Sequence, residues 1–268
     1  MNILFGVPLF YYRYNPQLLY KYIKYNEKST EKKIRYFYGN IACACQGGRN
    51  VNFPINWKVI EKEIKDINDN GIGVYITMSK CVLTKEDILD ENSNRMMSLI
   101  NVDNGLNGFI VSNDELSKHM HEKYPFVKQK MSQIRVATEN PTYRPIEYYK
   151  KLLESYEEVC VDTADVFNLD YIKQLDCSRL EVVCNHSCPP NCPFRPEHQN
   201  FIIEQQNKYL KNNIYKIEPF ECFYKNRPKE NMILTTKNYK DLLNIGFNKF
   251  KISGRHDPNV DKKIELIL

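Results

Sequence analysis

The sequence contains no run of 18 apolar residues, so it offers no candidate for a membrane-spanning helix. Its first residues carry neither the basic stretch nor the small-residue cleavage site of a signal peptide, and we therefore expect a cytoplasmic protein. No segment is rich enough in glycine, serine or proline to read as a linker, which favours a single domain over residues 1–268. The G-x-S-x-G motif of serine hydrolases and the H-E-x-x-H motif of zinc proteases are also absent.

Long blocks of lysine or arginine are missing too, although the formal net charge is +5 and the sequence pI is about 8.6. A solvated surface accounts for a charge of this size. A weak attraction to RNA or another anionic substrate is the alternative, and the 19 tyrosines could stack on bases. In a cytoplasmic protein, the nine cysteines fit ligands, catalysts or packing groups better than a disulfide framework.

Strand-like runs alternate with helix-like runs along the chain, as in parallel β-α-β units. The predicted strands are Ile3–Leu9, Ile34–Tyr38, Val74–Met78, Gly108–Ser112, Ile134–Thr138, Val159–Asp162, Leu180–Cys184 and Asn248–Ile252. The predicted helices are Pro16–Glu27, Pro54–Asn68, Leu83–Ile100, Asp114–His121, Pro145–Tyr156, Leu169–Leu175, Glu197–Leu210 and Val260–Leu268. Eight units in a chain of this length indicate a (β/α)8 barrel of the TIM type. The stretch 213–236 breaks the repeat and is predicted to be an insertion before the last strand.

In such a barrel, functional side chains gather where the strands end at their carboxyl side. Glu139 and Asp162 end predicted strands and are candidate acid and base groups. Lys251 and Arg255, at the end of the last strand, could hold a carboxylate or phosphate, although a surface ion pair would explain them equally well. The side chains predicted to bind substrate at the same end are Asn40, Asn113, Asn140, Asn185 and Arg195. Capping of helices is an alternative role for several of the asparagines.

The most specific local feature is a set of three cysteines, Cys184, Cys188 and Cys192, spaced four residues apart directly after the seventh predicted strand. Four prolines between residues 189 and 196 disfavour a regular helix over most of this segment. A stiff irregular loop can point several thiolates at one centre, and four thiolates are the usual shell of a [4Fe–4S] cluster or a structural zinc ion. The pattern therefore predicts a metal site at the mouth of the barrel.

The fourth ligand must come from elsewhere, and Cys222 in the predicted insertion is the first choice, with His186 and His198 as alternatives. Zinc sites usually show C-x2-C pairs, which this chain lacks, so an iron–sulfur cluster is favoured and zinc is the alternative. Cys43 and Cys45 follow the second predicted strand, where they could be redox-active or touch the substrate, although buried packing would suit them equally well.

With its alternating barrel pattern, its cysteines after the seventh strand and one more downstream, and Lys251-Ile-Ser253-Gly254-Arg255 near its end, the chain resembles the U32 peptidase-like family. That family's motif has glutamate where this chain has Ser253, and its cysteines lie further apart. The resemblance implies a cluster held by four cysteines, which match Cys184, Cys188, Cys192 and Cys222 by order. It also implies oxygen-independent hydroxylation of RNA bases or small organic substrates, with an electron donor or protein partner.

Two further hypotheses stay open at this stage. In one, the metal loop is structural and the chain is a hydrolase or lyase, a peptidase included, with Glu139 and Asp162 carrying the reaction. In the other, the chain is an accessory or RNA-binding protein that needs a partner for activity. An absorption band near 400 nm, expected of a cluster, would separate the redox enzyme from both.

Overall fold

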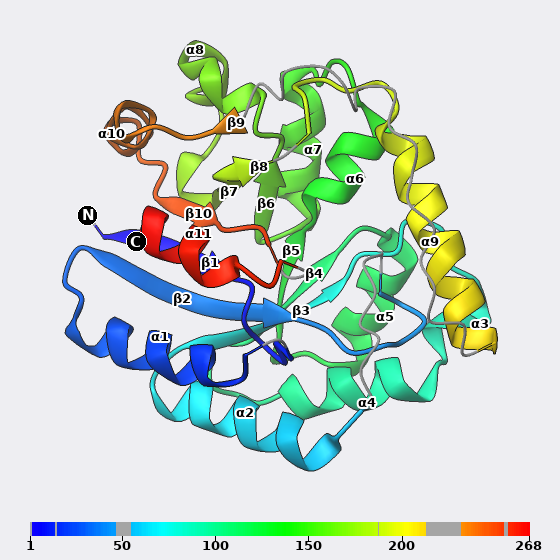
Figure 1. The fold of residues 1–268 in the computed structure, drawn as a ribbon. Coiled ribbons are helices and arrows are strands. Elements are labelled where there is room, and N and C mark those ends of the chain that lie inside the picture. Colours follow the sequence, from blue (N-terminus) through cyan, green and yellow to red (C-terminus); the bar gives the residue numbers. More distant parts are fainter. Residues whose placement is uncertain (1, 14, 47–54, 187, 213–231, 255–256) are drawn as a thin grey trace.

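Eight parallel strands close into a barrel in the computed structural model, which describes residues 2–13, 15–46, 55–186, 188–212, 232–254 and 257–268 (Figure 1). Around the barrel the order is β1-β10-β7-β6-β5-β4-β3-β2. The strands are β1 Ile3–Val7, β2 Lys32–Gly39, β3 Gly73–Met78, β4 Gly108–Val111, β5 Lys128–Met131, β6 Glu158–Val161, β7 Leu180–Val183 and β10 Lys249–Lys251. The (β/α)8 barrel expected from the sequence is confirmed.

Helices surround the barrel (Figure 1). They are α1 Gln17–Lys28, α2 Trp57–Asp69, α3 Lys85–Ile88, α4 Glu91–Ile100, α5 Asp114–Lys123, α6 Gln133–Glu139, α7 Ile146–Ser155, α8 Leu169–Ile172, α9 Arg195–Asn212, α10 Thr236–Asn244 and α11 Val260–Ile267, with single 3-10 turns at Asp165–Phe167 and Cys177–Arg179. A two-residue antiparallel pair, β8 Asn185–His186 with β9 Met232–Ile233, follows β7. None of the described helices is long and apolar enough to cross a membrane.

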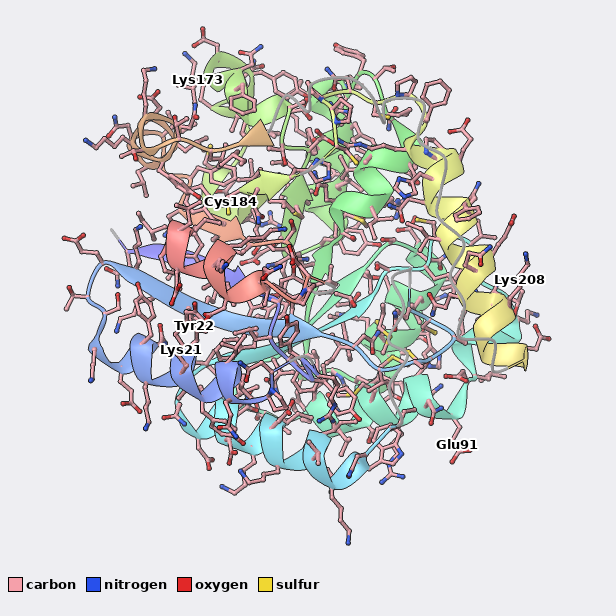
Figure 2. The ribbon with its side chains drawn as sticks, viewed as in Figure 1. Lys21, Tyr22, Glu91, Lys173, Cys184 and Lys208 are labelled. Atoms are coloured by element: carbon pink, nitrogen blue, oxygen red, sulfur yellow. The ribbon has the colours of Figure 1, made fainter. Side chains whose placement is uncertain are left out.

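The two ends of the chain meet, which closes the barrel. Strand β1 pairs with β10, with Phe5 opposite Phe250. Outside the strands, Tyr22 of α1 donates a hydrogen bond of 2.7 Å from its hydroxyl to Oδ1 of Asp261 in α11, and Lys21 forms an ion pair with the same carboxylate (Figure 2). These contacts hold the last helix against the first.

The barrel interior is filled by aromatic rings whose size is matched by glycines on neighbouring strands. The rings of Tyr36 and Tyr75 stack with centroids 4.1 Å apart, and both side chains are buried. A Cβ atom on Gly6 would lie 2.2 Å from Cζ of Tyr36, and one on Gly108 would lie 2.3 Å from Cε1 of Tyr75. Only glycine at these two positions leaves room for the stacked rings.

Next to these rings, the barrel interior holds a network of buried charged side chains. Lys130 is buried and donates hydrogen bonds to Oε1 of Glu181 at 2.7 Å and to the hydroxyl of Tyr36 at 3.1 Å. Glu158 accepts from Arg35 at 2.8 Å and also pairs with Lys249 and Lys130. Because a lone buried charge is costly, these groups depend on one another.

Three expectations about the elements are wrong. The fifth strand is Lys128–Met131 and not Ile134–Thr138, which forms most of helix α6 behind the capping side chain of Ser132. The predicted helix Leu83–Ile100 is two helices, α3 and α4, because Asp90 caps a new helix start. A helix, α10, precedes the last strand where none was predicted. Most of the predicted insertion, residues 213–231, lies outside the described part of the chain.

Candidate functional site

A cavity of about 140 Å³ lies at the carboxyl ends of the strands. Side chains that face the barrel interior form its base, among them Tyr38, Thr77, Val183 and Lys251. Ile110 of β4 and His186 of β8 also line it, and the rest of the wall comes from loops and helices beyond the barrel strands: Ser79, Ser132, Gln133, Ile134, Ala137, Cys188, Arg195, His198, Gln199, Ser253 and Gly254. This is the end of a β/α barrel at which ligands bind.

The cavity wall carries positive charge and, within the described residues, no carboxylate. Lys251 places its Nζ 4.2 Å from the centroid of the Tyr38 ring, a distance at which the π face attracts an ammonium group. Arg195 is 95 % buried, since its relative exposure is 5 %. Its Nε has no hydrogen-bond partner among the residues that the structure describes. The wall therefore presents two cationic groups to whatever occupies the cavity.

Asp162, at the end of β6, stands behind Arg195 and compensates its charge. Its Oδ2 accepts a hydrogen bond from Nη1 of Arg195, and its Oδ1 accepts one of 2.9 Å from the backbone N–H of Ala164. Burial alone would raise the pKa of this carboxyl, but Arg195 and Arg144 outweigh burial and hold the pKa below its usual value. Asp162 is thus an ionised carboxylate that orients a guanidinium, and its acid or base role stays a prediction.

Arg144 ties the cysteine-containing loop to the same corner of the barrel. It is buried and forms a bidentate pair with Asp165, with distances of 2.6 Å from Nε and 3.0 Å from Nη2. The same Nη2 donates to Oδ1 of Asn191, at 2.5 Å, and Asn191 has a φ of 52°, in the left-handed region. A buried arginine therefore fixes the loop between Cys188 and Cys192 in an uncommon backbone conformation.

Two of the three clustered cysteines differ in their surroundings. Cys188 lines the cavity, whereas Cys184, labelled in Figure 2, follows the cavity-lining Val183 of β7 and does not line the cavity itself. The Cys184 thiol lies 3.3 Å from the carbonyl oxygen of Lys251, and Tyr239 of α10 is its hydrogen-bond partner. Burial raises the pKa of this thiol to about 12. Cys184 is thus a buried thiol that contacts α10 through Tyr239.

Cys192 is also buried, with a relative exposure of 7 %, and both it and Cys188 are free thiols. Across the described ranges, no three histidine, cysteine or acidic side chains are grouped so that they could hold a metal ion. The predicted fourth ligand, Cys222, lies outside those ranges. The iron–sulfur cluster, with zinc as its alternative, therefore stays a prediction.

The four asparagines predicted to bind substrate do not line the cavity, and the side chains of Asn40, Asn113 and Asn185 bond to backbone atoms. Asn40 donates to the carbonyl of Thr77 and accepts from the N–H of Ile41. Asn113 caps α5, Asn140 follows α6 with its carbonyl bonded to Arg144, and Asn185 makes two hydrogen bonds with the Ser253 backbone. Of the five predicted substrate-binding residues, Arg195 is the one that the cavity wall includes.

Glu139 does not end a strand, because the segment before it is helical. Its carboxylate is half exposed, accepts from Nε of Arg135 at 2.8 Å and from the hydroxyl of Tyr148 at 2.9 Å, and no contact joins it to Asp162. The expected pair of carboxylates at the mouth is therefore not formed by these two residues. Arg255 lies outside the described residues. Lys251 lies where the sequence placed it, in the cavity wall.

Cys43 and Cys45 are both buried, and the Cys45 thiol donates to the carbonyl of Asp87 at 3.0 Å. Burial raises the pKa of each thiol to about 12, which fits packing groups.

The sequence did not predict two parts of the site. One is Arg144, which lies in a loop without a recognisable motif, and the other is the part of the cavity wall that α6 contributes. The signal for this cavity in the sequence is that Cys188 lies close along the chain to His186 and His198, which also line it.

No model of a known protein family matches the sequence, and no curated protein matches it either. Among solved structures, the chain is similar to "The Structure of the U32 Peptidase Mk0906", with a TM-score of 0.59, 13% identity, and coverage of 95% of this chain and 94% of that one. The chain has the fold of a U32 peptidase structure. A second match, an HpcH/HpaI aldolase from Desulfitobacterium hafniense DCB-2, has a TM-score of 0.36 at 12% identity, covering 99% of this chain and 92% of the aldolase. At 13% identity, the likeness to the U32 peptidase concerns the barrel and not its chemistry.

Proposed function

We propose that the protein is a U32 peptidase-like barrel enzyme that binds a small substrate bearing a carboxylate or phosphate group at the carboxyl-end mouth. One observation carries the proposal. The described cavity wall holds Lys251 and Arg195 but no acidic side chain, and Asp162, which pairs with Arg195, does not itself line the cavity. An anion in the cavity would complete the hydrogen bonding of Arg195, whose Nε is buried without a partner.

The binding test uses isothermal titration calorimetry with malonate as the probe. Lys251→Met removes one of the two cationic groups and is expected to weaken malonate binding about tenfold, because a charge-assisted hydrogen bond is lost. Lys237→Met is the matched control, since this lysine is 84% exposed on α10 and far from the cavity wall. Equal malonate affinity in the wild type and the Lys251→Met variant would contradict the proposal.

The finer chemistry follows from what occupies the cysteine loop. If a [4Fe–4S] cluster is bound, the enzyme is a redox or oxygen-independent hydroxylation enzyme on a small organic molecule or an RNA base, served by an electron donor. The test is iron and acid-labile sulfide per chain after anaerobic purification. Cys188→Ala is expected to lose both, whereas Cys177→Ala, at a buried thiol after α8, keeps them. Full iron content in both variants would remove Cys188 as a ligand.

A thiol-dependent hydrolase or lyase, including a peptidase, is the second candidate, and a specific arrangement favours it. Cys188 lines the same small cavity as His186 and His198, so a thiol nucleophile and candidate bases are close together. In this case the purified protein would contain no iron, and alkylation of Cys188 would abolish activity. Absence of iron together with full activity after alkylation would contradict this candidate.

An RNA substrate would have to present one unstacked base, because a cavity of about 140 Å³ admits no more than a small group. Binding to the phosphate backbone outside the cavity would then be strongly salt-dependent. A filter-binding titration with single-stranded RNA at low and high salt tests this version. Absence of binding at low salt would leave a small molecule as the substrate.

A further inference from the structure

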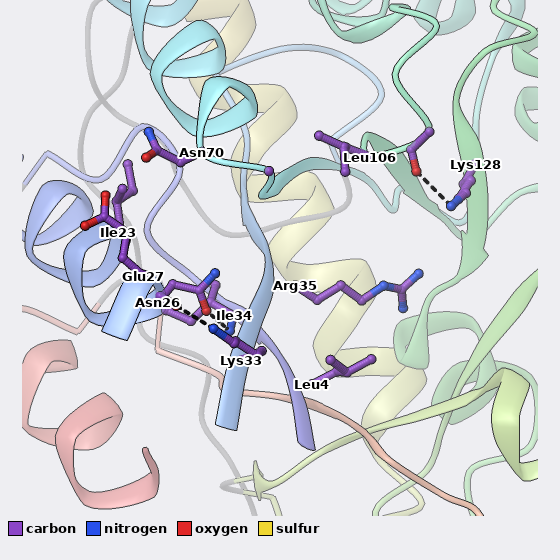
Figure 3. A pocket seen from close by; sticks show the side chains of 12 residues that line it. Leu4, Ile23, Asn26, Glu27, Lys33, Ile34, Arg35, Asn70, Leu106 and Lys128 are labelled. Carbon is purple, nitrogen blue, oxygen red and sulfur yellow. Dashed lines mark hydrogen bonds between the residues drawn. The ribbon is translucent and has the colours of Figure 1, made fainter. Parts of the chain in front are cut away.

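The opposite end of the barrel also opens into a cavity, of about 450 Å³. It lies where β2 and β5 begin and where α1 and α2 end (Figure 3). Three basic side chains line it, Lys33, Arg35 and Lys128, against one acidic side chain, Glu27, which is exposed on α1. We refer to this space as the lower cavity; it shares no residue with the wall of the cavity at the carboxyl-end mouth.

The two lysines of the lower cavity have carbonyl partners but no carboxylate partner. Nζ of Lys33 donates to the carbonyl oxygen of Asn26 at 2.9 Å, and Nζ of Lys128 donates to that of Gly105 at 2.8 Å, as Figure 3 shows. Among the described residues, neither forms an ion pair. An ammonium group has three N–H donors, and each lysine uses one of them on a backbone carbonyl. Two donors of each lysine therefore remain for a ligand.

Arg35 connects the lower cavity to the charges inside the barrel. It donates to Glu158 at 2.8 Å and to the hydroxyl of Tyr75 at 3.3 Å. This network contains three cations and two carboxylates: Arg35, Lys130 and Lys249 form ion pairs with Glu158 and Glu181. The interior network therefore holds one more positive than negative charge.

The pKa of Lys249 reflects first its burial and then these neighbouring charges. Burial lowers its pKa, Glu158 opposes this, and repulsion from Arg35 and Lys130 adds to the lowering, so the pKa stays below its ordinary value. Positive charge is thus in excess both in the wall of the lower cavity and behind it. Desolvated cations of this kind are stabilised by an anion at short range.

We propose that the lower cavity is a second binding site, for a small molecule with a phosphate or carboxylate group held by Lys33, Arg35 and Lys128. The site is distinct from the proposed substrate site, because the packed barrel interior separates the two cavities. Its size admits a ligand larger than one anionic group, with an apolar portion resting on Ile23 and Leu106. Glu27 at the rim would repel a ligand with a second negative charge on that side.

The test uses isothermal titration calorimetry on the full chain in the Lys251→Met background, in which binding at the carboxyl-end mouth is expected to be about tenfold weaker. Inorganic phosphate and citrate are the probes, in separate titrations, which distinguishes phosphate from carboxylate ligands. Lys128→Gln and Lys33→Gln are each expected to weaken binding of the preferred probe about tenfold, and Glu27→Gln to strengthen it. Lys173→Gln is the matched control, at the residue directly after α8, which lines neither cavity and is labelled in Figure 2.

Loss of affinity in both lower-cavity variants, with an unchanged Lys173→Gln variant, supports the site. Equal affinity in Lys128→Gln, Lys33→Gln and their parent overturns it, as does the absence of binding to either probe in a parent that retains its melting temperature. Failure of the substrate proposal gives a different result, because there Lys251→Met itself would leave malonate binding unchanged.

Discussion

Arg195, the first residue of α9, donates a hydrogen bond from Nη1 to Oδ2 of Asp162, the residue that follows β6. The two are 33 positions apart, and both are nearly fully buried. Because the cysteine-containing loop ends where α9 begins, this pair fixes one end of the loop. Arg144 holds the loop at a second point, through its hydrogen bond to Asn191. The position of Cys188 in the cavity wall therefore depends on two buried arginines and the carboxylates that neutralise them.

Replacing Arg144 by methionine keeps most of the side-chain volume but leaves the partly buried Asp165 without its bidentate partner and the buried Asp162 without one of its two neighbouring arginines. We expect the free energy of unfolding to fall by about 3–5 kcal/mol, as for other buried pairs broken on one side. Urea denaturation followed by circular dichroism measures this. Arg95→Met is the control, because Arg95 is half exposed and 3.6 Å from Glu61, and should cost about 1 kcal/mol or less. Similar losses in the two variants would show that the Arg144 network does not stabilise the fold.

The fold should lose stability in acid. Burial opposes ionisation of Glu158, but Lys130, Arg35 and Lys249 together hold its pKa well below the usual value, and the pKa of Asp162 is also lowered. A carboxyl whose folded-state pKa is depressed stabilises the protein above its unfolded pKa, near pH 4, and this contribution disappears as pH falls through the folded value. We expect the free energy of unfolding to decline from about pH 4.5 downward.

Urea midpoints measured at intervals from pH 7 to pH 3 test this expectation. Glu158→Gln should be less stable at neutral pH and should show a shallower decline in acid, because one titrating group has been removed. Glu27→Gln, at an exposed carboxylate, should keep the wild-type profile. An acid limb in Glu158→Gln as steep as that of the wild type would assign the decline to other groups.

Gly108→Ala should disturb the stacked rings inside the barrel. The new methyl group would lie 2.3 Å from Cε1 of Tyr75, which is buried on all sides, so the ring must shift. Overpacking of this kind costs about 1–3 kcal/mol. In a Tyr75→Leu background most of that cost should vanish, since the clashing ring is gone, and a double-mutant cycle from urea denaturation measures the coupling. An equal cost in both backgrounds would point to the backbone instead of the ring.

The cysteines should differ in their rates of alkylation. Cys188 lines the cavity and is only partly buried, whereas Cys160 and Cys184 are buried, which raises the pKa of each of these two thiols to about 12. Iodoacetamide at neutral pH, followed by peptide mass spectrometry, should label Cys188 in the native protein and the other two only after unfolding. Labelling of Cys184 as fast as Cys188 would contradict its placement under α10. Protection of Cys188 that an iron chelator removes would indicate a bound cluster.

Seven of the eight strands could be predicted because their outward faces are apolar and their runs end in polar or glycine-containing turns. Strand β5 could not, since its sequence Lys128-Gln-Lys-Met131 has no apolar alternation. Lys130 is buried there only because Glu158 and Glu181 on two other strands neutralise it. A local pattern cannot show a partner 51 residues away. The apolar run that follows is therefore the stronger strand pattern in the sequence, although it forms helix α6.

Part of the candidate site could likewise be predicted from the sequence. Lys251, Arg195 and Cys188 were found because they sit at the ends of correctly predicted strands or in a loop with an evident motif. The convergence of Cys184 on the same point was inferred from spacing alone, and spacing does not report that Val183 takes the inward-facing position on β7. Arg144 was missed because its partner Asn191 is 47 residues further along the chain.

The stacked rings of Tyr36 and Tyr75 have a consequence for the whole molecule. Together with Lys130, they occlude the barrel axis, so nothing the size of a ligand passes from one end to the other. Each end is a separate compartment that fills and empties from its own side. The two ends can still interact electrostatically. Glu181 and Glu158 lie between the two compartments, and a charge bound at one end changes the electrostatic potential at the other.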